Sequence, residues 1–560
     1  MDLDIKNLDI ENILKGYVAI DSISCTKREL DIFPYFSSCF SGYDFFDKYK
    51  EYVAKHEIKG DLFNRHVSYA LLRAHDDFVI NESIKDTICL IHHCDVVPVE
   101  DYKSMKDKAF LMDEIKKELE KNKDDFPQDI KEDIESGKYL FGRGCADMKG
   151  GGAIQIALLR QLAKKSKMKV NILLLALPDE ENLSAGMIGA ISLLKELKDK
   201  YKLRYKIMIN SEPHERKNDN NPLISLGSIG KIMPFIYVRG ALSHVGRIYE
   251  GLNPLNILSK VIDDFEANIK YSDKVLGECS PPPTFLYARD LKEEYNVSLP
   301  FSAAACLNWL ILNRTSTTIL KDINNSVENA IKTTCLNLEK GYEEFMQSKG
   351  EEYKELNWQI DINNCEDLIK LAQKDSPDFM NKLELFKSDL KDKIKSNQIS
   401  LINANFKLIE YILDFIKDSK PRVIFGFVPP YYPSVANALI DDLDEDVAGL
   451  FGKLRDFAKE HFKQDYASEH FFTGISDLSY SYIKNGSELE LEFLKYMPLY
   501  GWLYQLPFSQ IEEVSMPCIN IGPWGKGLHR YSERVLKEDL LDHTPRLLLE
   551  AIKLLSKRAS

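Results

Sequence analysis

Five side chains that could bind metal ions are spread along the chain, and each lies where a predicted strand ends. They are His93, Asp147, Glu181, Glu212 and His529. Ligands of an open α/β sheet bind at the carboxyl ends of its strands, so we expect these side chains to converge on one site. Imidazole and carboxylate groups, with one carboxylate shared, are the ligands that a site for two divalent metal ions needs. Two histidines and three carboxylates suit zinc, and also cobalt or manganese.

Residues beside the candidate ligands suggest supporting roles. Asp95 follows His93 by two residues, on the same side of an extended chain, and can accept the second ring N–H of that histidine. The adjacent side chains of Glu180 and Glu181 diverge, so one can bind a metal ion while the other acts as a general base towards the attacking water.

Asp147 is the natural bridging ligand, because the glycines at 142, 144 and 150–152 allow tight bends around it. The glycine run lacks the spacing of a phosphate-binding loop. Taken alone, His93 could be a core histidine capped by Asp95, and the two adjacent glutamates an acidic pair at a helix start. The whole ordered set favours a metal site over these separate interpretations.

Composition limits the classes of partner. The chain has 560 residues, a hydrophobic content of 44% and a formal net charge of -13, which argues against nucleic acid or an anionic membrane surface as a partner. No apolar run is long enough to span a bilayer, and the acidic N-terminus does not resemble a signal peptide, so we expect a cytoplasmic protein. Ten cysteines at irregular spacing, among them Cys89, Cys94, Cys145 and Cys518, indicate reduced, buried thiols.

The pattern of elements predicts an α/β fold, a mostly parallel sheet with helices on both faces. We expect strands at 65–74, 87–95, 170–178, 205–211 and 516–522, and helices at 9–22, 43–56, 149–166, 184–200 and 541–556, with a polar helical excursion at 105–136.

The sequence pattern changes near residue 229, which predicts a separate α+β domain inserted into the first. We expect residues 1–228 and 431–560 to form the first domain and 229–430 to form the inserted domain, called the lid below, with a charged helical insertion at about 364–420. Lid strands are expected at 231–244, 303–314, 353–363 and 421–433, and lid helices at 253–269 and 318–348.

Seven motifs occur in an order that is typical of one family. They are HCDVVP, GRGCADMKGG, PDEEN, SEP, GALSHVG, TGISD and GPWGKGLHRYSERV. In this order they resemble the M20 family of dinuclear zinc amidohydrolases and peptidases, and most of all its arginine-utilization (RocB-like) branch. The match spans roughly residues 85–260 and 470–535, and the ordered set is far more specific than any one piece.

The resemblance implies a role for each matching residue. His93 and Glu212 would bind one metal ion, Glu181 and His529 the other, Asp147 would bridge them, Asp95 would orient His93, and Glu180 would take a proton from the bridging water and pass it to the leaving amine. The peptide bond Asp147–Met148 would be cis. His244 in the lid would stabilise the oxyanion, and Arg314 is a candidate for binding the substrate carboxylate, with a surface ion pair as the alternative.

The resulting hypothesis is a metal-dependent hydrolase that cleaves an amide bond of a small N-acyl amino acid or short peptide. The resemblance suggests arginine or amino-acid catabolism as its setting. The alternatives are a catalytically silent metabolite- or partner-binding protein on the same scaffold, and a true aminopeptidase or dipeptidase. We expect no nucleic-acid or membrane partner. Both a monomer and a homodimer remain open, because an enlarged lid can replace the partner subunit of simple family members.

Overall fold

The computed structural model describes residue 5 and residues 8–74, 85–164, 168–216, 221–396 and 398–556. The chain forms two compact units. Unit 1 contains Met1–Ile229, Val435–Lys484 and Ser509–Ser560, and unit 2 contains Gly230–Ser434 and Asn485–Phe508. Residues 485–508 therefore belong to unit 2, whereas the sequence analysis placed them in the second part of the catalytic domain.

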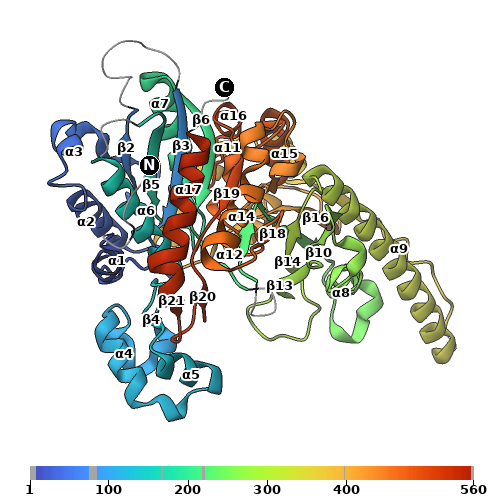
Figure 1. Ribbon diagram of the computed structural model, residues 1–560. Helices are drawn as coiled ribbons and strands as arrows, with labels where there is room; N and C mark the ends of the chain where they lie inside the picture. The colour runs from blue at the N-terminus through green and yellow to red at the C-terminus, as the bar shows by residue number, and fades with distance from the viewer. Residues whose placement is uncertain are drawn as a thin grey trace. The chain divides into compact units, whose positions relative to one another are not determined.

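An eight-stranded mixed sheet forms the centre of unit 1 (Figure 1). Its order is β1 (Val53–Glu57), β2 (His66–Leu72), β5 (Asn171–Leu177), β3 (Lys85–His93), β6 (Leu203–Asn210), β19 (Cys518–Asn520), β7 (Leu223–Ser225) and β18 (Ala467–Glu469). The central strands β5, β3, β6 and β19 are parallel, and so are β7 and β18. The pairs β1–β2, β2–β5 and β19–β7 are antiparallel, so the α/β fold is as predicted but the parallel part is smaller than expected.

Helices cover both faces of this sheet, which explains the buried apolar runs in the middle of its central strands. Ile88 and Leu90 of β3 join a core formed with one helical layer. That layer contains α1 (Ile10–Val18), α6 (Lys149–Leu162), α14 (Leu450–Phe462) and α17 (Thr544–Leu555). Cys89 and Ile91 alternate with them and point to the opposite face, where α7 (Ala185–Tyr201) packs.

A small helical excursion of unit 1 has its own core. It contains α4 (Met112–Lys121) and α5 (Gln128–Ser136), which pack beside a three-stranded sheet of β20 (Gly525–Lys526), β21 (Arg534–Leu536) and β4 (Tyr139–Phe141) (Figure 1). Ile115, Leu119, Ile130 and Tyr139 are among the buried residues of this core. The polar excursion expected at 105–136 is therefore a packed element and not a loose loop.

Unit 2 is built on a second, mostly antiparallel sheet. Its order is β13 (Thr284–Asp290), β14 (Ser302–Ile311), β10 (Pro234–Arg239), β16 (Arg422–Phe427) and β15 (Asp361–Asn363), and β9 (Gly230–Ile232) also pairs with β14. The helices α10 (Cys365–Asp375), α11 (Phe379–Lys395) and α12 (Leu401–Leu413) form the expected helical insertion and contribute to one core with the sheet.

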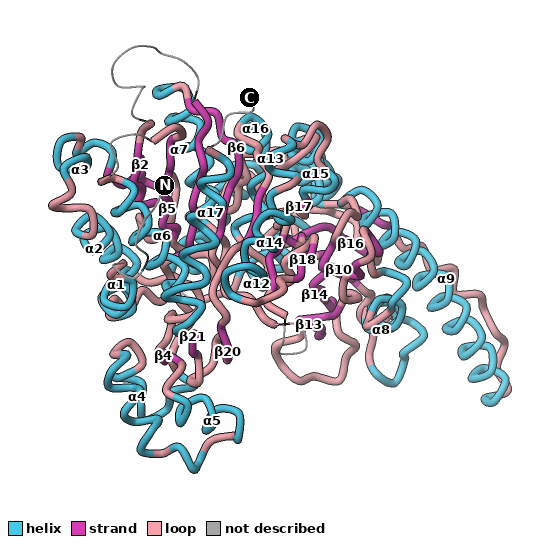
Figure 2. The backbone as a smooth tube through the Cα atoms, in the orientation of Figure 1, coloured by secondary structure: helices cyan, strands magenta, loops and turns pink. Residues whose placement is uncertain are grey.

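Two further helices of unit 2, α8 (Leu255–Phe265) and α9 (Ser316–Lys349), pack against each other. The buried residues of α9 end at Thr334. Figure 2 shows that the last turns of α9 extend beyond the sheet of this unit. Its first half is therefore buried against the rest of the unit, whereas its second half makes surface contacts, such as those of the Tyr342 and Phe345 rings with Tyr249.

Several smaller elements complete the two units. They are α2 (Ile32–Ser38), α3 (Asp44–Lys48), α13 (Glu445–Ala448), α15 (Gly486–Tyr496), α16 (Phe508–Glu513), the strand pair β8 (Gly227–Ser228) and β17 (Val435–Ala436), and the strand pair β11 (Lys274–Val275) and β12 (Glu278–Cys279).

Two predicted elements differ from the structure. The helix expected at 43–56 is only α3, because residues 53–57 pair with residues 66–70 as the edge strand β1. The strand expected at 353–363 is reduced to β15, since only Asp361–Asn363 find partners, on β16. In both cases long-range pairing, which the local pattern does not contain, decides the outcome.

The cysteines agree with the expectation of reduced thiols. All ten are free, and Cys89, Cys94, Cys145 and Cys518 are buried. Among the helices of the described residues, none is both long enough and apolar enough to cross a membrane.

Candidate metal centre

The five predicted ligands come together in unit 1, where β3 and β6 end. His93 Nε2 lies 3.0 Å from Asp147 Oδ1 and 3.7 Å from Glu212 Oε1. His529 Nε2 lies 3.2 Å from the other oxygen of Asp147, Oδ2, and 3.1 Å from Glu181 Oε1. Each oxygen of Asp147 therefore faces a different histidine, which is the arrangement that a bridging carboxylate requires.

These side chains fit a pair of divalent cations. His93, Asp147 and Glu212 form one group, and Asp147, Glu181 and His529 a second, with the ligand atoms of each group within 4.8 Å of one another. Glu180 belongs to a third such group with His93 and Glu181. Imidazole nitrogen with carboxylate oxygen is a donor set that zinc, cobalt and manganese accept.

Glycines allow the elements beneath the site to approach closely. A Cβ atom on Gly151 of α6 would lie 2.1 Å from the backbone oxygen of Ser211, next to Glu212. Gly144 has a φ of +81°, in the left-handed region. The peptide bond Asp147–Met148 is cis, as the family resemblance implies. The glycine run thus brings the start of α6 against the end of β6.

Asp95 holds the turn that carries the two glutamates. Its carboxylate accepts hydrogen bonds from the backbone N–H of Glu180 at 3.0 Å, from the backbone N–H of Glu181 at 3.2 Å, and from Ser24 Oγ at 2.5 Å. His93 Nδ1 lies 3.1 Å from the backbone oxygen of Asp95 and 3.6 Å from its carboxylate. Asp95 therefore contacts the imidazole mainly through its backbone, while its side chain fixes the Glu180–Glu181 turn.

A buried ion-pair cluster around Asp179, the residue before Glu180, supports the same turn. Asp179, with a φ of +69°, pairs with the guanidinium of Arg65 and accepts a hydrogen bond from the backbone N–H of Ala185 at 3.2 Å. Arg65 also contacts Glu29 at 3.3 Å and Asp61 at 2.6 Å. The guanidinium of Arg65 thus contacts three carboxyl groups, and burial raises the pKa of one of them, Glu29, to about 9.

Glu533 holds the backbone that carries the bridging ligand Asp147. It accepts hydrogen bonds from the backbone N–H groups of Ala146, at 3.0 Å, and Asp147, at 3.1 Å. Its other oxygen pairs with Arg143 at 3.0 Å. The segment after β20, which carries His529, is therefore tied to the segment that carries Asp147.

Burial and crowding shift the protonation of the site. Burial raises the pKa of Glu180 and of Glu212 well above the usual range, although His93 opposes this. Burial alone would lower the pKa of His93, but Glu212 and the hydrogen bond with Asp147 outweigh it and raise that pKa. Hydrogen bonds with Asp147 and Glu181 raise the pKa of His529 to about 10. The crowded carboxylates therefore favour the protonated forms of the neighbouring side chains. A bound cation would displace these protons.

Comparison with known proteins decides the family. The sequence profile described as Peptidase family M20/M25/M40 matches residues 89–453. The chain belongs to this family. It is accordingly a metal-dependent amidohydrolase, and the resemblance of its ordered motifs is confirmed.

Two curated relatives from Bacillus subtilis (strain 168) cover almost the whole chain. The "Uncharacterized protein YqjN" is 29% identical over 559 residues, 98% of this chain and 96% of the relative. "Protein RocB" is 28% identical over 535 residues, 94% of this chain and 91% of the relative. The crystal structure of aminopeptidase PepT from Bacillus cereus ATCC 10987 shares the fold, with a TM-score of 0.51, 13% identity and 98% of each chain covered.

Two predicted site residues of this M20 chain lie in unit 2. His244 is exposed, and its Nδ1 accepts a hydrogen bond from the backbone N–H of Gly246 at 3.1 Å. The guanidinium of Arg314 pairs with Asp273 at 3.0 Å and with Asp322 at 2.5 Å. Two carboxylates already neutralise Arg314, as in the structural alternative that the sequence analysis left open.

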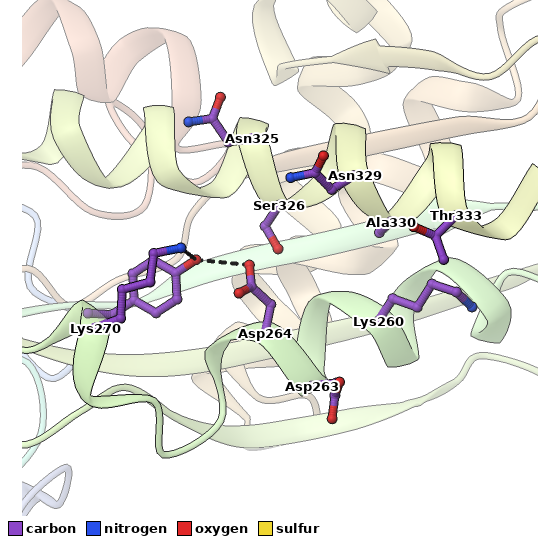
Figure 3. A pocket seen from close by; sticks show the side chains of 10 residues that line it. Lys260, Asp263, Asp264, Lys270, Asn325, Ser326, Asn329, Ala330 and Thr333 are labelled. Carbon is purple, nitrogen blue, oxygen red and sulfur yellow. Dashed lines mark hydrogen bonds between the residues drawn. The ribbon is translucent and has the colours of Figure 1, made fainter.

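Unit 2 also has a polar hollow of about 340 Å³ between α8 and α9 (Figure 3). It is lined by Lys260, Asp263, Asp264, Lys270, Tyr271 and Asn325, among others. Asp264 accepts a hydrogen bond from the hydroxyl of Tyr271 at 2.9 Å, and Lys260 donates to the backbone oxygen of Asn256. None of the predicted site residues lines it.

The sequence analysis missed the residues that support the ligands from a distance. Asp179 lies in the PDEEN motif but was given no role, and Arg65 lies in none of the seven motifs. Glu533 lies four residues after His529 inside a quoted motif, so its position was a usable signal. Asp477 of the TGISD motif is buried, and burial raises its pKa to about 7. Its charge helps to raise the pKa of both Glu180 and Glu212.

Proposed function

We propose that this chain hydrolyses an amide bond of a small N-acyl amino acid or short peptide with the help of two divalent metal ions, zinc in the first place and cobalt or manganese as alternatives. The observation that carries the proposal is the position of Asp147, whose two oxygens face His93 and His529 at 3.0 and 3.2 Å.

The surrounding side chains divide into two sets. His93 and Glu212 would hold one ion, Glu181 and His529 the other, and Asp147 would be shared. When bound, the ions would supply Lewis acidity to the amide carbonyl and lower the pKa of the attacking water. Glu180 would accept a proton from this water and deliver it to the leaving amine. Its raised pKa suits a group that holds a proton between these two steps.

The substrate side of the proposal rests on the family. His244 would stabilise the developing oxyanion. Arg314 would bind a substrate carboxylate in competition with its two ion pairs. We therefore propose a smaller role in substrate binding for Arg314 than for His244. We place the reaction in amino-acid catabolism, with arginine or ornithine derivatives as first substrates to try, because of the likeness to RocB. A cytoplasmic protein without nucleic-acid or membrane partners, as a monomer or homodimer, is part of the same proposal.

The test is a hydrolysis screen with N-acyl amino acids and dipeptides, using zinc-loaded protein with and without a chelator. We expect turnover that the chelator abolishes and added zinc restores. Glu180→Gln should keep its metal content and lose about 10²–10⁴-fold in kcat. Glu120→Gln, on the exposed face of α4, is the matched control and should behave as wild type. Full activity of the Glu180 variant would overturn the assigned mechanism.

A further inference from the structure

His529 is the most exposed of the candidate metal ligands, and its position depends on the loop that carries it. Its side chain is 53% exposed, whereas those of Asp147, Glu181 and Glu212 are 13%, 9% and 6% exposed. It has a φ of +62° and lies in the segment that joins β20 to β21. Little packing around the imidazole holds it, so its position depends on contacts of the neighbouring residues, among them those of Glu533 with the Asp147 segment.

The two strands that flank His529 place like charges opposite each other. Lys526 on β20 and Arg534 on β21 are cross-strand partners. Such a pair is destabilising unless a counter-charge lies between the two cations. Arg534 is only 2% exposed, so its charge cannot be left to solvent.

Asp133 on α5 provides that counter-charge. Its Oδ2 accepts a hydrogen bond from Lys526 Nζ at 3.0 Å and another from Arg534 Nε at 2.7 Å. The carboxylate is 13% exposed. One oxygen from the excursion therefore ties together both strands at the base of the His529 segment.

Two more contacts extend this support. The ring of Phe126, also in the excursion, lies 5.5 Å from the ring of Tyr531, two residues after His529. Arg534 donates to the backbone oxygen of Ser532 inside the segment at 3.0 Å. The excursion thus contacts the segment at its base and near its tip.

We propose that Asp133 is a positioning residue for His529, and that the α4–α5 excursion serves as a brace that keeps this ligand at the metal site. The inference rests on the proposed two-metal function. It predicts that loss of Asp133 weakens the ion held by Asp147, Glu181 and His529, and leaves the ion held by His93 and Glu212 nearly unchanged.

The test is a titration of metal-free full-length protein with zinc, and separately with cobalt, whose visible absorption reports coordination geometry. We expect wild type to bind two ions, and Asp133→Asn to bind one ion normally and the other about 10–100-fold more weakly. Asp133→Glu should restore part of the loss. Asp124→Asn is the matched control, since Asp124 is 79% exposed and pairs with Lys131 in the same excursion. It should bind both ions as wild type does.

Phe126→Ala tests the same idea at the other contact and leaves both carboxylates that pair with Arg534, Asp133 and Asp129, in place. It should weaken the same ion to a smaller degree. Normal binding of both ions by Asp133→Asn, or equal weakening of both together with a lower unfolding temperature of the metal-free protein, would overturn the brace. A wild-type protein that binds fewer than two ions would instead overturn the proposed function on which the brace depends.

Discussion

Asp147 shows how one residue can define the chemistry of this site. Its carboxylate separates His93 from His529, and each histidine reaches a further glutamate. Without cations, protons must offset the negative charge of Asp147, Glu181 and Glu212. This explains why His93 and His529 have raised pKa values.

Metal binding should therefore release protons. Histidine and carboxylate ligands bind metal only when deprotonated, and the pKa values of both histidines, Glu181 and Glu212 are raised. We expect zinc affinity to increase from pH 6 to pH 8, with more than one proton released per chain. Calorimetric titrations in buffers of different ionisation enthalpy measure this number. A heat that does not depend on the buffer would contradict it.

His244 should affect turnover and not metal content. Replacing it with Ala removes the proposed oxyanion donor, which is typically worth about 10²–10³ in kcat. We expect a loss of this size in hydrolysis assays, with unchanged zinc by elemental analysis. The exposed His461, on α14 of unit 1, offers His461→Ala as a control. A normal kcat for the His244 variant would remove it from the chemistry.

At the level of elements, Gly151 near the start of α6 approaches the backbone of Ser211, directly after β6, and so brings the segments that carry Asp147 and Glu212 together. Gly151→Ala would drive a methyl group against the backbone of Ser211, so we expect the free energy of unfolding to fall by about 1–3 kcal/mol. Gly452→Ala in α14 meets no atom within 4 Å and should raise it by about 0.5–1 kcal/mol. Denaturant unfolding measures both. Equal effects would mean that the close approach does not matter.

The sequence predicted the elements that carry ligands better than those that support them. Strands β3, β5 and β6 each contain a buried apolar run and end in His93 or just before the acidic ligands, so the hydrophobic pattern and the position of the ligands predicted the same elements. Asp133 lies in the predicted polar helical excursion, where nothing in the local sequence distinguishes it from the other charged residues. Its partners Lys526 and Arg534 lie 393 and 401 residues further along the chain, and no local pattern predicts such a contact. No local pattern predicts the contact between Arg65 and Asp179 either, because 114 residues separate them.

Long-range pairing also explains the misplaced elements. Residues 53–57 become a strand because β2 offers them a free edge. Most of 353–363 has helix-like or polar composition and meets no strand, so only its last three residues pair with β16. Strands that are buried on both faces have apolar runs that identify them clearly in the sequence. Strands at a sheet edge, or buried on one face, have weaker patterns.

For the whole molecule, the thiols give a simple check on the fold. All ten cysteines are free, and Cys279 is the exposed one. We expect a thiol reagent to modify Cys279 first in the native protein, and ten thiols to react after unfolding without reductant. Mass spectrometry of the modified chain measures both stages. Fewer than ten reactive thiols in freshly prepared, unfolded protein would reveal a disulfide and contradict the fold.

The central claim is that five side chains of unit 1 hold two metal ions that share Asp147. The most direct measurement is the number of metal ions per chain, by elemental analysis of protein purified without chelator and again after zinc is added back. The account predicts about two ions per chain after zinc addition. One ion or none, even in excess zinc, would contradict it.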